Sequence, residues 1–212
     1  MDNQKTYPRI MHGQRATIAG RSGAGKSTLA KWLLNRSPGN WLIINPKWTA
    51  AYNSLESSKV IKGLDYKKIE KSLFENKFTI VNPLPDELDY QSLDNFISII
   101  QESYNNIGLC VDELYMLHRN GQAGKGLLGW LTRGRELNQS FIGLTQRPSW
   151  ISKFLFSEAN YIGCMSLLLH NDRKTVYELT GQECVLNKLE PKKWFWFDAD
   201  ADSMRLFGPV PK

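Results

Sequence analysis

The sequence has 212 residues, 42% of them hydrophobic, and a formal net charge of +6. This length predicts a single domain, residues 1–212, whose core is large enough to fold without crosslinks. No run approaches the roughly 18 apolar residues of a membrane span, and Met1–Lys5 lack the apolar region of a signal peptide. We therefore expect a soluble, cytoplasmic protein. The basic charge favours a polyanionic partner without establishing one.

The three cysteines are an odd number and show no C-x-x-C spacing, and the three histidines are too scattered to form a cluster. These patterns argue against a cysteine–histidine metal site and against a disulfide framework. We expect Cys110, Cys164 and Cys184 to be buried thiols in a reducing compartment.

Apolar strand-like runs alternate with helical stretches along the chain. This alternation predicts an α/β fold with a mostly parallel central sheet flanked by helices on both faces. The expected strands are Arg15–Ala19, Trp41–Asn45, Phe78–Val81, Gly108–Val111, Phe141–Thr145, Tyr161–Leu168 and, at an edge of the sheet, Trp194–Phe197. The expected helices are Lys26–Leu34, Tyr90–Tyr104, Leu127–Leu137, Ser149–Phe156 and Arg173–Leu179. The Lys- and Glu-rich segment Ser54–Asn76 is expected to be solvated surface structure.

The segment Gly20–Ser27 fits the phosphate-binding pattern G-x-x-x-x-G-K-[ST], and it lies between a predicted strand and a predicted helix, as that pattern requires. Glycines let the backbone wrap closely, so that successive N–H groups point at phosphates, and the helix N-terminus adds its positive dipole. Lys26 is expected to reach the β- and γ-phosphates of ATP, and the Ser27 hydroxyl to ligate Mg²⁺. The predicted nucleotide-binding residues are Gly20, Arg21, Ser22, Gly23, Ala24, Gly25, Lys26, Ser27 and Thr28.

The apolar run Ile107–Val111 ends in two carboxylates, Asp112 and Glu113. Parallel strands are buried on both faces, so polar chemistry emerges at their ends. We predict that Asp112 holds the Mg²⁺ shell, mainly through water, and that Glu113 orients and deprotonates the attacking water. A metabolite kinase does not need the second carboxylate, because its acceptor supplies the nucleophile, whereas a hydrolase does. Two ordinary acids at a strand end are the alternative interpretation.

The segment His118–Gly126 is glycine-rich, basic and free of acids. This composition predicts a flexible loop that grips a phosphate backbone through Arg119 and Lys125 without reading base sequence. The sequence therefore indicates a nucleic-acid backbone or another polyanion as a partner at this loop. An ordinary surface loop is the alternative.

The run Phe141–Thr145 predicts another buried strand, which leads into Gln146, Arg147 and Pro148. A glutamine at that point can hydrogen-bond a γ-phosphate or the attacking water, so we predict a catalytic role for Gln146. Taken with the phosphate loop and the acidic pair, this motif resembles those of the FtsK–HerA family of ring-shaped DNA-pumping ATPases.

The resemblance extends from Gln14 to Phe197. Asn45-Pro46-Lys47 looks like the family's Asp-Pro-Lys, with Asn in place of Asp. Further along, Asn171–Thr175 resembles the family's short polar turn before a helix. Leu189-Glu190-Pro191, leading into Trp194–Phe197, resembles its closing strand.

The resemblance implies a RecA-like P-loop core and ATP sites between the subunits of a homo-hexameric ring. A bare motor domain of this size is most similar to the genome-packaging ATPases of tailless viruses with an internal membrane. That similarity implies DNA as the track and a portal or membrane-vertex protein as the docking partner. It also implies a location in the host cytoplasm or on the virion.

A site between subunits needs a cation from the neighbour to stabilise charge on the γ-phosphate. Relatives carry an arginine about where Arg135 lies, so the resemblance assigns Arg135 as this trans residue, with Arg133, Arg147 and Arg173 as alternatives. A solvated helix end, where arginines favour the negative end of the dipole, is the other interpretation of Arg133 and Arg135. Without such a residue, the predicted site lacks an obvious cation on the open side of the γ-phosphate.

The leading hypothesis is an ATP-driven DNA translocase. One alternative is a nucleotide-gated structural component of a virion or secretion apparatus, in which ATP orders an assembly. A small-molecule P-loop kinase is a weaker alternative, because Glu113 and Gln146 are present and no arginine-rich lid is evident.

Overall fold

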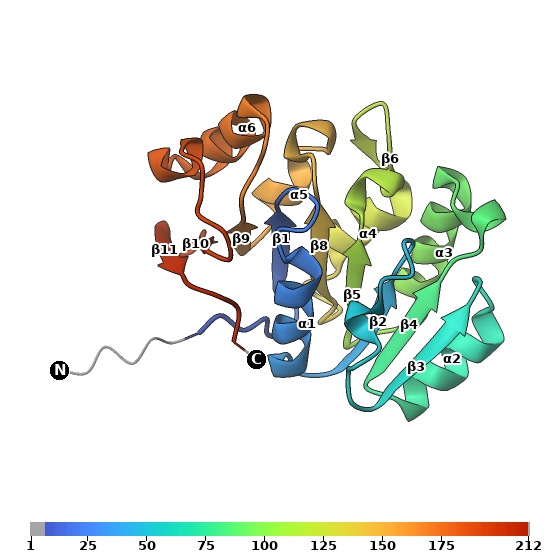
Figure 1. Cartoon of the computed structure of the whole chain (residues 1–212). Coiled ribbons are helices and arrows are strands. Elements are labelled where there is room, and N and C mark those ends of the chain that lie inside the picture. Colours follow the sequence, from blue (N-terminus) through green and yellow to red (C-terminus); the bar gives the residue numbers. More distant parts are fainter. Residues whose placement is uncertain (1–6, 212) are drawn as a thin grey trace.

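A computed structural model describes residues 7–211, and within them the central feature is a nine-stranded sheet with the order β11-β10-β9-β1-β8-β5-β2-β4-β3. The strands from β9 to β3 are parallel to one another, whereas β10 is antiparallel to both of its neighbours, β9 and β11. In Figure 1 the parallel strands point upward, so that their carboxyl ends lie along the upper edge. The strands are β1 (Arg15–Ala19), β2 (Asn40–Ile44), β3 (Ser58–Lys62), β4 (Phe78–Asn82), β5 (Ile107–Asp112), β8 (Ser140–Thr145), β9 (Tyr161–Cys164), β10 (Trp194–Asp198) and β11 (Ser203–Phe207).

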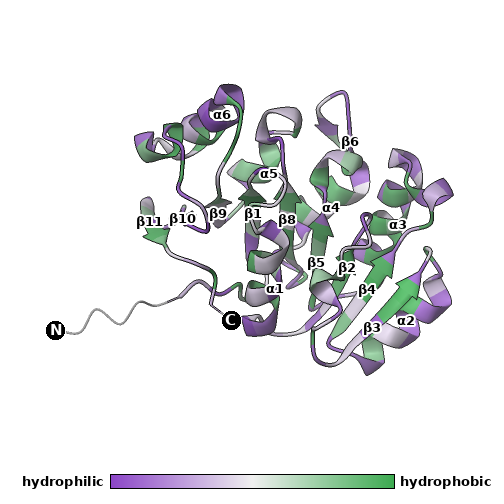
Figure 2. Ribbon diagram, viewed as in Figure 1, coloured by the Kyte–Doolittle hydropathy of each residue, from purple (hydrophilic) through white to green (hydrophobic). Residues whose placement is uncertain are grey.

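Helices cover both faces of the sheet, because alternate apolar side chains of each buried strand point to opposite faces. Helix α1 (Lys26–Arg36) lies in front of the sheet in Figure 1, and it packs in one buried cluster with Ile43 and Trp41 of β2. The intervening residue of β2, Leu42, joins a second cluster on the other face. Figure 2 shows green, apolar strands between helices with purple outer surfaces. The helices of the second face are α2 (Tyr66–Glu75), α3 (Tyr90–Ser103), α4 (Lys125–Arg133), α5 (Phe154–Ser157) and α6 (His170–Thr180).

The predicted α/β class is therefore confirmed, and the sheet order explains where the predicted motifs meet. Ala19 at the end of β1 lies opposite Thr145 at the end of β8. On the other side of β8, Leu144 lies opposite Asp112 at the end of β5, and β2 is the next strand along. The carboxyl ends of parallel strands share one edge, so the segments that follow these four strands are brought together there.

The expectation that the aromatic strand Trp194–Phe197 lies at an edge is wrong. β10 pairs with β9 on one side and with β11 on the other, and β11 was not expected from the sequence. Phe207 of β11 stacks on Trp194 with the ring centroids 4.5 Å apart, and Trp194 is fully buried. The additional strand thus covers aromatic surface that would otherwise face water.

The segment Ser54–Asn76 is surface structure, as expected, but it is ordered into β3 and α2. Helix α2 begins at the Asp65 cap, whose carboxylate accepts a hydrogen bond from the Lys68 N–H at 3.1 Å. The helix buries Ile69 and Leu73, so the charged residues of this segment occupy its outer side.

Further boundaries differ from the prediction. The expected helix Leu127–Leu137 is α4, which begins at Lys125 and ends at Arg133. The expected strand Tyr161–Leu168 ends at Cys164. The expected helix Ser149–Phe156 is broken, because Ile151 is extended and buried between a 3-10 turn, Pro148–Trp150, and α5. The expectation of a polar turn at Asn171–Thr175 is wrong, since these residues lie within α6. Asp172 lies in the first turn of this helix, where a negative charge stabilises the positive end of the helix dipole.

Residues Met1–Lys5, in which no signal peptide was expected, lie outside the described residues. No helix within residues 7–211 is both long enough and apolar enough to cross a membrane. Cys110 and Cys164 are buried, as expected, whereas Cys184 is only half-buried, and all three thiols are free.

Candidate nucleotide site

The phosphate loop Gly20–Ser27 connects β1 to α1 at the carboxyl edge of the sheet. Its path depends on glycine: Gly25 adopts a φ of 101°, and a Cβ at Gly20 would lie 2.8 Å from the Cβ of Met165. Helix α1 has no side-chain cap at its amino end. The first N–H groups of the helix therefore remain free for an anion, which is the arrangement that binds phosphate.

Lys26 is folded back over this loop. Its Nζ donates a hydrogen bond to the Arg21 carbonyl oxygen at 3.2 Å, and the residue is only 9% exposed. Burial lowers the pKa of Lys26 to about 8, with the Asp112 charge opposing the shift and the Lys47 charge adding to it. The ammonium group is poorly solvated, so an incoming phosphate would provide a stronger, charge-assisted hydrogen bond than the carbonyl does.

Ser27 and Asp112 meet at one side of the loop. The Ser27 Oγ donates to Asp112 Oδ2 at 2.7 Å, and the Tyr52 hydroxyl donates to the same oxygen at 3.0 Å. Tyr52 is fully buried and comes from the 3-10 turn Ala50–Tyr52. Burial raises the pKa of Tyr52 well above its usual value, so the phenol remains a donor. Tyr52 was not expected at this site from the sequence.

A hydroxyl and a carboxylate are oxygen donors of the kind that Mg²⁺ accepts, usually together with waters and substrate phosphates. Ser27 and Asp112 therefore fit the predicted metal. Within residues 7–211, no group of three or more His, Cys, Asp or Glu side chains is placed to hold a metal ion. The site therefore fits a metal ion that two side chains and a bound nucleotide would hold together, rather than an ion enclosed by protein alone.

Glu113 has the most unusual backbone in the site, with a φ of 142°. Non-glycine residues rarely adopt such angles, which cost roughly 1–3 kcal/mol and tend to occur at functional sites. The residue is 2% exposed, and its Oε2 accepts a hydrogen bond from Gln146 Nε2 at 2.8 Å. Its Oε1 is buried without a hydrogen-bond partner among the described residues. A free carboxylate oxygen at this point fits the predicted binding of an attacking water.

Lys47 is a site residue that the sequence analysis did not assign a role. Its Nζ forms an ion pair with Glu113 Oε2. The turn that carries it is fixed by Asn45, which is fully buried: its Oδ1 accepts from the Thr49 N–H at 3.0 Å, and its Nδ2 donates to Asn82 Oδ1 at 2.9 Å. Asn45 Nδ2 also donates to the Thr49 carbonyl oxygen at 3.2 Å, which an aspartate could not do, and this gives a physical reason for Asn at this position. The Asn-Pro-Lys similarity was the available signal for this turn.

These side chains share one cavity of about 340 Å³ at the carboxyl edge. Its walls are Ser22, Gly23, Gly25, Lys26, Ser27, Thr28, Lys47, Thr49, Ala51, Asp112, Glu113 and Gln146. Most of the predicted nucleotide, metal and catalytic residues are thus brought together. Arg21 and Ala24 instead line a neighbouring cavity of about 580 Å³, together with Ser166 and residues 188–193.

The candidate trans arginines lie outside the phosphate cavity of their own chain. Arg135 is exposed and precedes β8, so it lies towards the amino edge of the sheet, beside Arg15 and Glu158. Arg133 donates to Gln101 Oε1 at 3.1 Å. Arg173 donates to the carbonyl oxygens of Leu167 and Leu168, at 3.0 Å each.

The remaining candidate, Arg147, is held by a buried carboxylate. Its Nε donates to Asp172 Oδ2 at 3.0 Å, and its guanidinium lies 4.0 Å from the centre of the Trp150 ring. Asp172 is 1% exposed and also accepts from the Ser149 N–H and hydroxyl, at 3.2 and 2.6 Å. Asp172 thereby joins α6 to the segment that follows Gln146.

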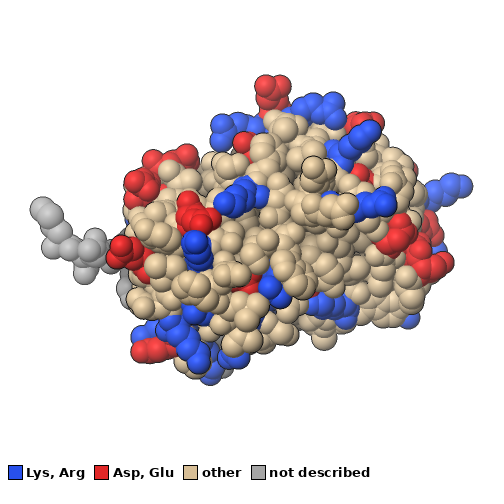
Figure 3. Space-filling view, turned by 90° about the horizontal axis from the view of Figure 1, so that it is seen from above, with Lys and Arg blue, Asp and Glu red and all other residues tan. Residues whose placement is uncertain are grey.

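The basic segment His118–Gly126 is more ordered than expected. Residues His118–Arg119 (β6) pair with Gln122–Ala123 (β7) in a small hairpin that projects above the carboxyl edge in Figure 1. Arg119 and Lys125 are exposed, and Lys125 is the first residue of α4. Figure 3 shows this upper face, on which lysines and arginines are spread around a mostly uncharged centre.

Comparison with known proteins bears on this site. No family model matches the sequence. The DNA packaging ATPase P9 of Enterobacteria phage PRD1 is 27% identical over 210 residues, which covers 93% of this chain and 88% of P9. The predicted resemblance to packaging ATPases of the FtsK–HerA type is confirmed.

Several solved structures share the fold. The genome packaging NTPase B204 of Sulfolobus turreted icosahedral virus 2, in complex with AMPPCP, has a TM-score of 0.73 and 15% identity, and the match covers 94% of this chain and 99% of that one. VirB4 of Thermoanaerobacter pseudethanolicus has a TM-score of 0.70 and 14% identity, with coverage of 93% and 89%. The described fold is that of a P-loop ATPase.

Proposed function

We propose that this protein is the ATPase of a viral genome-packaging motor, which hydrolyses Mg-ATP to move DNA. The observation that carries the proposal is the single cavity in which the phosphate loop faces Asp112, Glu113 and Gln146. A hydrolase needs that combination of phosphate binding and a carboxylate for water. The similarity to a phage DNA packaging ATPase supports DNA as the track.

In this proposal the phosphate loop and Lys26 bind the β- and γ-phosphates, and Ser27 and Asp112 hold Mg²⁺. A Mg²⁺ ion held by these two side chains would help to neutralise the negative charge of the phosphates. Glu113 orients a water through its free Oε1 and takes its proton. Gln146 holds the other carboxylate oxygen, which aims Glu113 at the γ-phosphate. The proposed assembly is a homo-hexamer that docks on a portal or membrane-vertex protein.

Tyr52 tests the proposed metal site. Because Tyr52 donates to Asp112 Oδ2, Tyr52→Phe should leave that carboxylate less well oriented. We expect the Mg²⁺ concentration for half-maximal hydrolysis to rise about tenfold or more, as for other partners of metal ligands. The matched control is Tyr66→Phe, since Tyr66 is 40% exposed on α2. An unchanged Mg²⁺ requirement in Tyr52→Phe would show that Asp112 does not hold the metal through this oxygen.

The proposed function is tested by measuring the ATPase rate with and without duplex and single-stranded DNA, beside native mass measurement of the oligomer. A motor should hydrolyse ATP faster when DNA is present, and the rate should follow ring formation. Slow turnover that no DNA accelerates would instead indicate a nucleotide-gated assembly component. A phosphorylated metabolite as product would indicate a kinase.

The β6–β7 hairpin and the start of α4 provide the proposed DNA contacts. The double variant Arg119→Ala, Lys125→Ala should reduce DNA stimulation but leave basal hydrolysis near normal. Binding should also become less salt-dependent, because each lost phosphate contact lowers the slope of log K against log salt by about 1. The control, Lys59→Ala with Lys71→Ala, removes equal charge from exposed positions on β3 and α2. If both double variants changed the salt slope equally, the hairpin would not be a DNA contact.

A further inference from the structure

The ion pair between Lys47 and Glu113 joins a half-exposed side chain to a buried one. The Lys47 side chain is 49% exposed, whereas that of Glu113 is 2% exposed. Lys47 and Gln146 both engage Oε2 of Glu113, and Oε1 has no partner among residues 7–211. Both donors therefore restrain the carboxylate from one side and leave the other oxygen for water.

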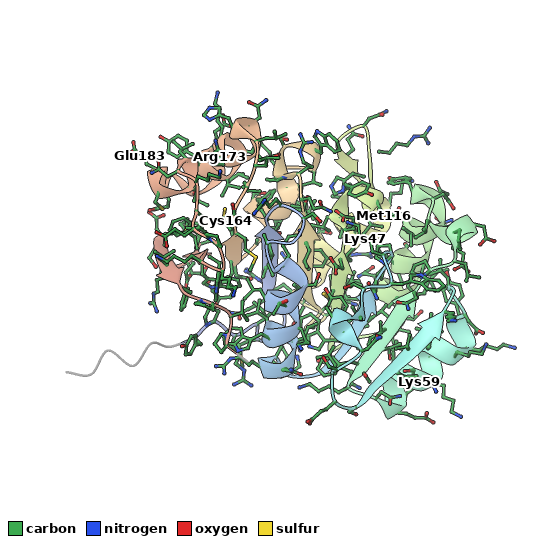
Figure 4. All side chains as sticks on the ribbon, viewed as in Figure 1. Lys47, Lys59, Met116, Cys164, Arg173 and Glu183 are labelled. Carbon is green, nitrogen blue, oxygen red and sulfur yellow. The ribbon has the colours of Figure 1, made fainter. Side chains whose placement is uncertain are left out.

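Lys47 also lines the phosphate cavity, together with residues of the phosphate loop. Lys26 lines the same cavity. Figure 4 shows Lys47 below the upper edge near the middle of the molecule, whereas Lys59 lies on the far edge of the sheet. Two lysines thus face the same small cavity from different elements, α1 and the turn after β2.

The charges in the cavity predict that Glu113 and a bound γ-phosphate compete for Lys47. Asp112 Oδ2 already accepts hydrogen bonds from Ser27 and Tyr52. Lys47 forms its ion pair with Glu113 instead. A γ-phosphate carries more negative charge than one carboxylate, and it would enter between the two lysines. A lysine has a flexible stem and three donors, and the half-exposed stem of Lys47 can turn without leaving a buried void.

We propose that Lys47 is a catalytic residue that binds the γ-phosphate of ATP from the same subunit and in doing so leaves Glu113. This inference rests on the proposed ATP site. It provides the cation that the predicted site lacked on the open side of the γ-phosphate. The fixed turn at Asn45 places the backbone of Lys47, while its side chain moves between the two anions.

The step that follows is ordinary hydrolysis. The oxygen of a water bonds to the γ-phosphorus, and one water proton passes to Glu113. The bond between the γ-phosphorus and the bridging oxygen breaks, and its electron pair stays on the β-phosphate of ADP. Lys47 stabilises charge on the γ-phosphate oxygens during this transfer and returns to Glu113 when inorganic phosphate leaves.

The test removes the ion pair first, so that an effect through Glu113 cannot be mistaken for a contact with phosphate. In a Glu113→Gln background, calorimetry measures binding of AMPPCP and of ADP, each with Mg²⁺, before and after Lys47→Met. We expect Lys47→Met to weaken AMPPCP binding about 10- to 100-fold, which is the effect of losing a hydrogen bond to a charged group, and to leave ADP binding unchanged. Lys47→Arg should keep the preference for AMPPCP.

Lys59→Met is the matched control, since Lys59 is an exposed lysine on β3 outside the cavity. Thermal unfolding without nucleotide verifies that each variant is folded. Equal affinity for AMPPCP before and after Lys47→Met would overturn the proposal and leave Lys47 as a group that only positions Glu113. An equal loss for AMPPCP and ADP would overturn it as well. If the wild-type protein bound neither nucleotide, the proposed function itself would fail.

Discussion

Replacing Glu113 with Gln should leave ATP bound but stop its turnover. The amide keeps the size of the side chain and can still contact Gln146, but it cannot accept a proton from water at neutral pH. Loss of a general base typically costs about 10²–10⁴ in rate. Single-turnover measurements of ADP formation, beside equilibrium binding of ATP, separate the two effects. Turnover by Glu113→Gln at the wild-type rate would remove Glu113 as the base.

The control for this variant is Lys26→Ala, which should impair the binding of ATP as well as its hydrolysis. Lys26 supplies the charge that the N–H groups of the loop lack, so its loss should both weaken ATP binding and abolish measurable hydrolysis. A pair of variants with the same rate defect but different ATP affinities would separate phosphate binding from water activation. Equal affinities would mean that Lys26 does not contact the phosphates.

Arg135→Ala should still bind ATP and assemble, but hydrolyse almost nothing if Arg135 reaches the neighbouring subunit. An arginine supplied in trans is worth roughly 10³–10⁵ in rate. Arg135 lies outside the phosphate cavity of its own chain, so a contribution within one subunit is not expected from its position. The rate of the wild-type protein should also rise with protein concentration as rings form.

Mixing Arg135→Ala with Lys26→Ala tests the geometry. An interface that joins the intact phosphate loop of one subunit to the intact Arg135 of another should regain activity, because the two variants share no defect. Absence of rescue in rings shown to contain both subunits would exclude Arg135 and direct attention to Arg133, Arg147 and Arg173. If none of these arginines were needed, Lys47 would remain as the proposed cation on the open side of the γ-phosphate.

The central part of this fold could be predicted because its signals are local. An apolar run followed by Gly20–Ser27 specifies a strand, a loop and a helix within a short stretch, and the structure begins β1 and α1 where the sequence analysis did. The strand leading to Asp112 was equally clear, since its residues are apolar up to the first carboxylate. Parallel pairing then brings these ends together without further information.

The parts that were missed depend on contacts between distant segments. Tyr52 reaches Asp112 over 60 positions, and Lys47 reaches Glu113 over 66. No local sequence pattern predicts that a given tyrosine or lysine will face the site, because the order of strands in the sheet determines which segments meet there. β11 was missed for the same reason: it pairs with β10 and its Phe207 stacks on Trp194, while its own residues show no strong alternation.

The carboxylate of Asp172 has a mechanical consequence. Arg147 and Ser149, which follow Gln146, are both tied to it, and Asp172 is part of α6. A displacement of Gln146 would therefore be expected to move α6 as well, because the segment after Gln146 is hydrogen-bonded to that helix. The first turns of α6 lie at the upper end of the molecule in Figure 1, so a shift of the segment after Gln146 would alter the position of that surface.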